Sequence, residues 1–178
     1  MKKICSFLLA LLCAAPAGAA DSTRYFNAAG PRLSVQSGVV RDGLRLLLHA
    51  PGLKGDDFLR AARKYVNSES AWKAPQGYTN TRVALRNCNA ELLRKDGEPH
   101  EKAVLLLHGG AYILKLSNIY RSMAVRYSRM AGDADVFCPD YRLAPEHVFP
   151  AALDDALDAW NRLLAQGYKP WNILVVGD

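Results

Sequence analysis

The chain has 178 residues, of which 50% are hydrophobic and 22% are charged. This length and balance are typical of one globular domain and exclude a fibrous or intrinsically disordered protein. The formal net charge is +6, but basic and acidic residues are interspersed without a long basic run, which argues against a nucleic-acid-binding surface.

Residues 1–20 have the pattern of a signal peptide. Two lysines precede an apolar run over residues 4–15, and small residues at 17–19 offer a cleavage site. Because the run is too short to span a bilayer comfortably, we expect cleavage at the end of the leader and export to the periplasm or the medium. A membrane anchor is the lesser alternative. Lipidation at Cys13 is a further one, and the bulky Leu12 before it argues against it.

Two cysteines remain after removal of this leader, Cys88 and Cys138. Export permits a disulfide bond between them. We slightly favour the other interpretation, in which they are two half-buried thiols on separate strands.

In residues 21–94 the spacing of apolar residues changes from every three to four positions to weak alternation. We expect irregular structure with one short helix over residues 21–52, followed by a helix from Asp56 whose apolar residues recur every three to four positions. That helix should end before the turn signal at 75–77. The weakly alternating segments 81–86 and 90–94 then predict an antiparallel hairpin at a sheet edge.

The second half predicts alternating strands and helices. The apolar run 103–107 indicates a strand buried on both faces. We then expect a helix over 118–130, a short strand at 136–138, a long helix with Pro150 in its first turn and Gly167 at its end, and a fully buried strand over 173–176. This order predicts an α/β fold with a mostly parallel sheet.

The segment His108-Gly109-Gly110-Ala111-Tyr112 directly follows a predicted buried strand. Consecutive glycines allow a backbone to approach a ligand and to point its N–H groups toward it. Such N–H groups stabilise the oxyanion that forms when an ester carbonyl is attacked. A plain glycine turn at the end of a strand explains the glycines equally well.

Two further segments follow predicted strands. The polar loop 140–147 lies between a strand and a helix; there we expect Asp140 and Arg142 to form an ion pair that braces the loop, and its chemistry alone does not demand catalysis. Gly177 and Asp178 directly follow the last predicted strand.

The runs HGGAY, DYRLAPEH with FPAALDDA after it, and VVGD together resemble the hormone-sensitive-lipase-like family of α/β-hydrolases. In that family GD continues into GDSAGG, the sharp turn that carries the nucleophile. The resemblance covers residues 80–178, and DYRLAPE is its specific part. One departure is Ala111, where the family often has a third glycine; its small side chain should leave Gly109 and Gly110 free to donate.

The resemblance implies a carboxylic ester hydrolase that needs no metal or cofactor and acts on small-molecule esters. Its triad follows the order serine, acid, histidine, so the serine is expected directly after Asp178, and neither a triad acid nor a triad base lies in the chain. The oxyanion donors are the N–H groups of Gly109 and Gly110. The resemblance gives structural roles in the motifs to His108, Ala111, Asp140, Arg142, Gly177 and Asp178, and His147 is expected on the loop surface.

The implied organisation is a leader (1–20), a segment that forms part of a helical cap (21–79), and the N-terminal half of a hydrolase domain (80–178). We expect the chain alone to be inactive and prone to aggregate through the apolar edge of its last strand. Two alternatives stay open: half of a split hydrolase completed by a second chain, and a non-catalytic interaction protein. A nucleotide-binding protein is more distant, because the chain lacks the corresponding glycine-rich motifs.

Overall fold

The computed structural model describes residues 56–97 and 101–178. The predicted leader, the irregular segment 21–52 and two of the four histidines, His49 and His100, lie outside these residues. Contacts divide the chain into two compact units, residues 1–61 and 62–178, and the second contains the whole described sheet. The predicted helix from Asp56 is confirmed as α3 (Asp56–Asn67).

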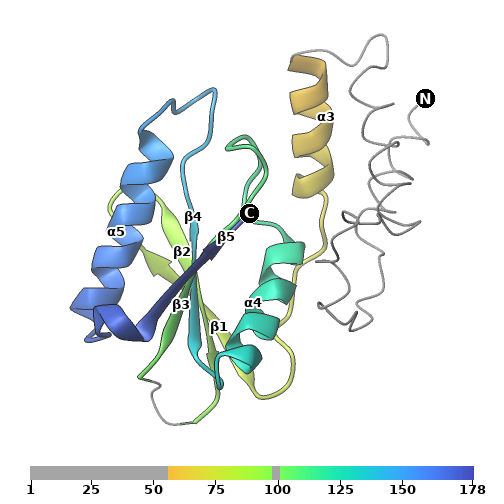
Figure 1. Ribbon diagram of the computed structural model, residues 1–178. Helices are drawn as coiled ribbons and strands as arrows, with labels where there is room; N and C mark the ends of the chain where they lie inside the picture. Colours follow the sequence, from red (N-terminus) through yellow and green to blue (C-terminus); the bar gives the residue numbers. More distant parts are fainter. Residues whose placement is uncertain (1–55, 98–100) are drawn as a thin grey trace, which may run out of the picture. The chain divides into compact units, whose positions relative to one another are not determined.

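Five strands form one mixed sheet in the order β1-β2-β4-β3-β5 (Figure 1). The hairpin strand β2 pairs antiparallel with both β1 and β4, whereas β3 pairs parallel with both β4 and β5. The predicted parallel part is therefore confirmed for the last three strands, and the hairpin makes the sheet as a whole mixed. The strands are β1 (Tyr78–Ala84), β2 (Asn89–Lys95), β3 (Ala103–Leu107), β4 (Asp135–Asp140) and β5 (Ile173–Gly177).

Strand β3 is buried on both faces, as its continuous apolar run predicts. Val104 and Leu106 pack in a core with α4 (Asn118–Met130), and Ala103 and Leu105 pack in a second core with α5 (Ala151–Ala165). The two helices thus cover opposite faces of the sheet (Figure 1). No helix within residues 56–97 and 101–178 is long and apolar enough to cross a membrane.

The two crossover connections leave β3 in the middle of the parallel strands. β4 lies on one side of β3 and β5 on the other. The carboxyl ends of all three strands therefore meet at one edge of the sheet, the edge at which open α/β sheets bind their ligands. Each of the three sequence motifs begins at this edge.

Helix α5 differs from its prediction at one end. Gly167, with φ of 97°, ends the helix as predicted, and the N–H groups of Gly167 and Tyr168 bond back to the carbonyls of Leu164 and Leu163 at 3.0 and 3.3 Å. Pro150, however, is the N-cap rather than a first-turn residue, because its φ and ψ of −98° and 20° lie outside the helical range.

Full burial of the last strand, which its apolar run predicts, is wrong, whereas the exposed apolar edge expected for the chain alone is confirmed. The side chains of Leu174 and Val175 point to opposite faces of the sheet, and these residues are 54% and 50% exposed. The cause is position: among the described residues β5 pairs only with β3, so it is an edge strand.

We expect this edge to drive self-association of the 178-residue chain, because an unpaired strand flanked by apolar side chains offers a template for another strand. Val175→Lys should lower the associated fraction several-fold in sedimentation velocity, since a lysine on the edge disfavours strand addition. Asn161→Lys, on the exposed surface of α5, adds the same charge and should leave association unchanged. Equal association of both variants would contradict the edge as its cause.

Candidate active site

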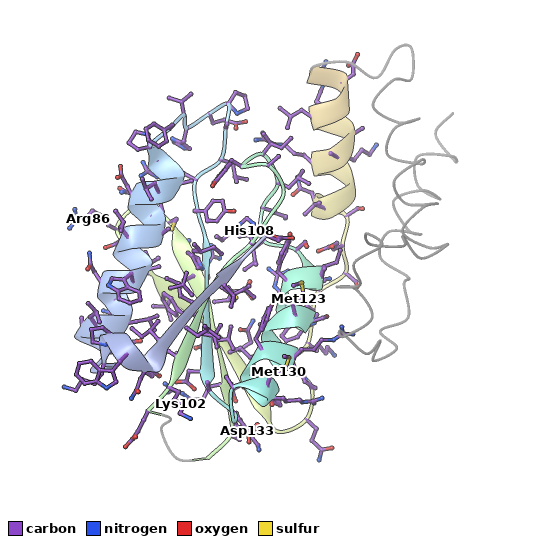
Figure 2. The ribbon with its side chains drawn as sticks, in the orientation of Figure 1. Arg86, Lys102, His108, Met123, Met130 and Asp133 are labelled. Atoms are coloured by element: carbon purple, nitrogen blue, oxygen red, sulfur yellow. The ribbon has the colours of Figure 1, made fainter. Side chains whose placement is uncertain are left out.

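The three motifs come together at the carboxyl edge of the sheet. The HGGAY residues follow β3, Asp140 ends β4, and Asp178 follows β5. The Asp178 carboxylate accepts a hydrogen bond from Tyr120 Oη, which lies 3.0 Å from each of its oxygens. His108 lies at this edge, and Lys102 and Asp133 lie at the opposite end of the sheet (Figure 2).

We call residues 108–117, which follow β3, the glycine loop. This loop folds as a tight turn and does not simply extend the strand. The N–H groups of Ile113 and Leu114 both donate to Gly110 O, at 3.0 and 3.1 Å. Gly110 has φ of 110°, and a Cβ there would lie 2.8 Å from Leu114 Cβ. Ala111 and Tyr112 also have positive φ, at 55° and 59°. Left-handed backbone costs a non-glycine residue on the order of 1 kcal/mol, so Ala111 occupies a position that a glycine would adopt without strain.

Gly109 is needed for a different reason, namely close approach. A Cβ on Gly109 would lie 2.2 Å from Asp178 Oδ1 and 2.6 Å from Tyr120 Oη. Burial and the hydrogen bond to Asp178 raise the pKa of Tyr120 to about 12, against a backbone hydrogen bond from Gly109 that lowers it. The neutral phenol therefore links the end of β5 to the start of the glycine loop.

His108 is a buried imidazole that fixes the start of this loop. Its ring stacks on Tyr141, with centroids 4.1 Å apart and planes at 5°, and the Tyr141 hydroxyl donates to His108 O. Nδ1 lies 2.9 Å from Gly109 O, which requires the proton on that nitrogen. Nε2 has no hydrogen-bond partner among the described residues and lies 3.9 Å from Asp140 Oδ1. Burial lowers the His108 pKa, although Gly109 O, Asp140 and Asp178 act in the opposite direction.

The expected ion pair between Asp140 and Arg142 does not form. Arg142 instead binds Asp155 in α5, through its backbone N–H at 2.9 Å and through Nε and Nη2 at 3.0 and 2.9 Å. Asp155 is 1% exposed, and a buried carboxylate requires charged, hydrogen-bonding donors of this kind. Asp140 accepts from the Leu116 N–H at 2.9 Å. The loop is braced by an ion pair, as predicted, but with another partner.

Several residues of the site gave no signal in the sequence. Tyr120 was an ordinary helix position, and Asp155 lay within the FPAALDDA run without a role of its own. Arg63 in α3 donates to Ala144 O at 2.6 Å and to Ile113 O at 3.0 Å, partners that lie 81 and 50 residues away. No spacing rule joins residues so distant, so only the folded chain shows these contacts.

A pocket of about 450 Å³ lies beside the polar loop, lined by residues that include Arg63, Cys88, Asp140 and Glu146. Gly109, Gly110 and Asp178 do not line it, whereas Ile113 and Lys115 of the loop after β3 do. Cys88 and Cys138 are free thiols, as the favoured interpretation has it, but Cys138 is fully buried and Cys88 lies in the turn between β1 and β2 and not on a strand. No cluster of three or more potential metal ligands occurs within the described part of the chain.

The backbone conformation of the glycine loop predicts opposite effects of two substitutions on the free energy of unfolding. Ala111→Gly should raise the free energy of unfolding by up to about 1 kcal/mol, because glycine tolerates φ of 55°. Gly110→Ala should lower it by about 1–3 kcal/mol through strain and the contact with Leu114. Urea denaturation measures both, and a destabilising Ala111→Gly would contradict the assigned conformation.

The lowered pKa of His108 predicts a loss of stability in acid. As pH falls through the ordinary histidine value near 6.5, the unfolded chain takes up the proton before the folded chain does. The free energy of unfolding should then fall by at most about 1.4 kcal/mol per pH unit between about pH 7 and pH 5. His108→Gln should flatten this slope, whereas His147→Gln, at an exposed position, should leave it unchanged. Identical slopes in all three chains would refute the buried, neutral imidazole.

Comparison with known proteins agrees with this architecture. Residues 104–178 match a family described as having the alpha/beta hydrolase fold. The carboxylesterase/phospholipase LipF of Mycobacterium tuberculosis is 37% identical over 111 residues, which are 60% of this chain and 30% of that protein. An ethyl acetate hydrolase of Pseudomonas putida is 40% identical over 80 residues, 43% of this chain and 25% of that protein.

Solved structures extend the likeness over more of the chain. EstE5, in crystals soaked with p-nitrophenyl butyrate, has a TM-score of 0.62 and 39% identity, covering 78% of this chain and 47% of EstE5. An esterase from the bacterial hormone-sensitive lipase family has a TM-score of 0.56 and 30% identity, covering 76% and 44%. The chain thus spans less than half of these structures and about a third of LipF. The described residues have the α/β-hydrolase fold, and the three motifs and these relatives make the chain similar to hormone-sensitive-lipase-like, carboxylesterase-type members of that fold.

Proposed function

We propose that these residues supply the oxyanion-stabilising loop and the nucleophile-bearing strand of a serine carboxylic ester hydrolase. The observation that carries the proposal is the contact between the glycine loop and the end of β5. The Asp178 carboxylate lies so close to Gly109 that a Cβ there would be 2.2 Å from Oδ1. A reacting carbonyl at the end of β5 is therefore within reach of the loop's N–H groups.

In the proposed mechanism, a serine directly after Asp178 attacks the ester carbonyl, and a histidine takes its proton and returns it to the leaving alcohol. The N–H groups of Gly109 and Gly110 stabilise the negative charge that develops on the carbonyl oxygen. Among the described residues the Gly110 N–H has no acceptor, which suits this role.

The proposed substrates are small carboxylic esters. The support is chemical likeness to the relatives, one of which is named for ethyl acetate and another of which was soaked with p-nitrophenyl butyrate. Export is proposed from the leader pattern of residues 1–20, and a cap role for residues 21–79 from the resemblance. The donor set calls for no metal or cofactor, because proton transfer and backbone N–H groups suffice for acyl transfer.

Among the described residues, no nucleophile paired with a base lies at this site. His108 is buried with its Nδ1 facing Gly109 O, and His147 is exposed on the polar loop. Neither hydrogen-bonds to a serine hydroxyl in the described part of the chain. Removing a triad residue typically lowers turnover on the order of a million-fold, so we propose that the chain alone does not hydrolyse esters at a useful rate.

A second candidate is a hydrolase half that a further polypeptide completes. The observation in its favour is the β5 edge, where Leu174 and Val175 are about half exposed on opposite faces of the sheet. An added strand with cover on both faces would bury both side chains. In this reading the partner carries the serine, the acid and the histidine.

The test measures p-nitrophenyl butyrate hydrolysis by the purified chain, alone and after co-expression with the part of EstE5 that this chain does not cover. We expect a rate equal to buffer for the chain alone and turnover for a stable pair. Gly110→Ala keeps its N–H group but should move it out of position through strain and the contact with Leu114, so kcat of that pair should fall about 100-fold, as it does when an oxyanion donor is removed. Hydrolysis by the chain alone would contradict the missing triad. A stable pair whose activity ignores Gly110→Ala would contradict the oxyanion assignment.

A further inference from the structure

Arg63, near the end of α3, hydrogen-bonds through all three guanidinium nitrogens to two site loops. Nε donates to Ile113 O at 3.0 Å, and Nη2 donates to Ala144 O at 2.6 Å. Nη1 and Nη2 also bind the two Glu146 carboxylate oxygens, at 2.5 and 2.8 Å. One side chain thus contacts the loop after β3 and the loop after β4.

These contacts surround a backbone hydrogen bond that joins the two loops. The Ala144 N–H donates to Tyr112 O at 2.8 Å. Arg63 binds the carbonyl of Ala144 on one side of this bridge and the carbonyl of Ile113, the residue after Tyr112, on the other. A planar guanidinium suits this arrangement because its donors point in fixed, diverging directions, which the single ammonium of lysine does not offer.

The clamped segment is the strained part of the glycine loop. Ala111 and Tyr112 are both non-glycine residues in left-handed conformation, with φ of 55° and 59°. Such residues persist only where the surrounding contacts hold them. The bonds around Tyr112 and Ile113 are contacts of this kind, and Arg63 supplies one of them directly.

We infer that Arg63 is a positioning residue for the oxyanion loop: its bonds to the Ile113 and Ala144 carbonyls hold Ala111 and Tyr112 in the left-handed conformation that orients the Gly110 N–H. The link to Gly110 as a donor rests on the proposed function, whereas the conformational part does not. Arg63 also lowers the pKa of Glu146 to about 2, so the carboxylate that anchors the guanidinium is ionised throughout the neutral range.

The competing explanation is an ordinary surface ion pair that only fastens α3. Exposed ion pairs contribute little to stability, and the Arg63 and Glu146 side chains are 26% and 55% exposed. The two explanations differ in what Arg63→Gln does to the glycine loop. A fastening role loosens α3 alone, whereas a positioning role loosens residues 108–117 and 141–150 together.

Hydrogen exchange read by mass spectrometry on the 178-residue chain separates them. Arg63→Gln should raise exchange of both loops about tenfold, since charge-assisted hydrogen bonds are lost. Arg63→Lys should not restore protection, and Glu146→Gln should have a smaller effect because both carbonyl contacts remain. The matched control is Arg60→Gln on the same helix, where Arg60 is exposed and pairs with Asp57 at 2.9 Å; it should change neither loop.

The decisive arm repeats Arg63→Gln in an Ala111→Gly chain. Glycine removes strain at residue 111, so the loop needs less support, and the effect of Arg63→Gln on residues 108–117 should fall at least twofold. The same effect in both backgrounds, or an unchanged 108–117 peptide in Arg63→Gln, would overturn the inference. If Arg63→Gln loosens β3 as well, the same comparison made with Arg63→Lys decides. Exchange does not depend on ester turnover, so failure of the proposed function leaves this result intact.

Discussion

Parallel pairing of β3 with both β4 and β5 is the constraint on which the site depends. It places three carboxyl ends side by side, so that motifs 30 to 70 residues apart along the chain share one edge. The pairing in turn requires apolar side chains on both faces of β3, because α4 and α5 cover opposite sides. A polar residue within this strand would lose its solvation with no partner available. The placement of the site residues at this edge therefore depends on an apolar strand that contributes no functional side chain.

Buried ion pairs fix the chain at the two ends of β4. Asp155 is almost fully buried and receives three donors from Arg142, which fixes the chain just after β4. At the other end of β4, the fully buried Asp135 pairs with Arg94 and accepts from the Tyr168 hydroxyl. Such pairs add little net stability over apolar packing, but leaving one partner alone is expensive. They therefore specify where each loop starts more than they strengthen the fold.

The sequence predicted the elements well because their signals are local. The run 103–107 and the glycine after α5 are signals that depend on neighbouring residues only, and both lie where the sequence predicts. Burial of β5 does not follow from its apolar run, because it depends on which strands lie beside it. The Arg142 partner was misjudged because Asp140 is near in sequence whereas Asp155 is near in space. Tyr120 and Arg63 escaped notice for the same reason, since their partners lie 50 or more residues away. The sequence motifs identify the loops of the site, and only the folded structure shows which residues hold those loops in place.

The close approach of Asp178 to Gly109 has a consequence for how this site can vary. The space that a methyl group at position 109 would need is already occupied by a carboxylate oxygen and a phenol oxygen. Position 109 cannot then be enlarged by itself: a larger residue there requires a shift of the Asp178 and Tyr120 side chains or a smaller residue at one of those positions. In an engineered library these three positions form one unit of variation, and a graft of the loop onto another scaffold has to carry all three together.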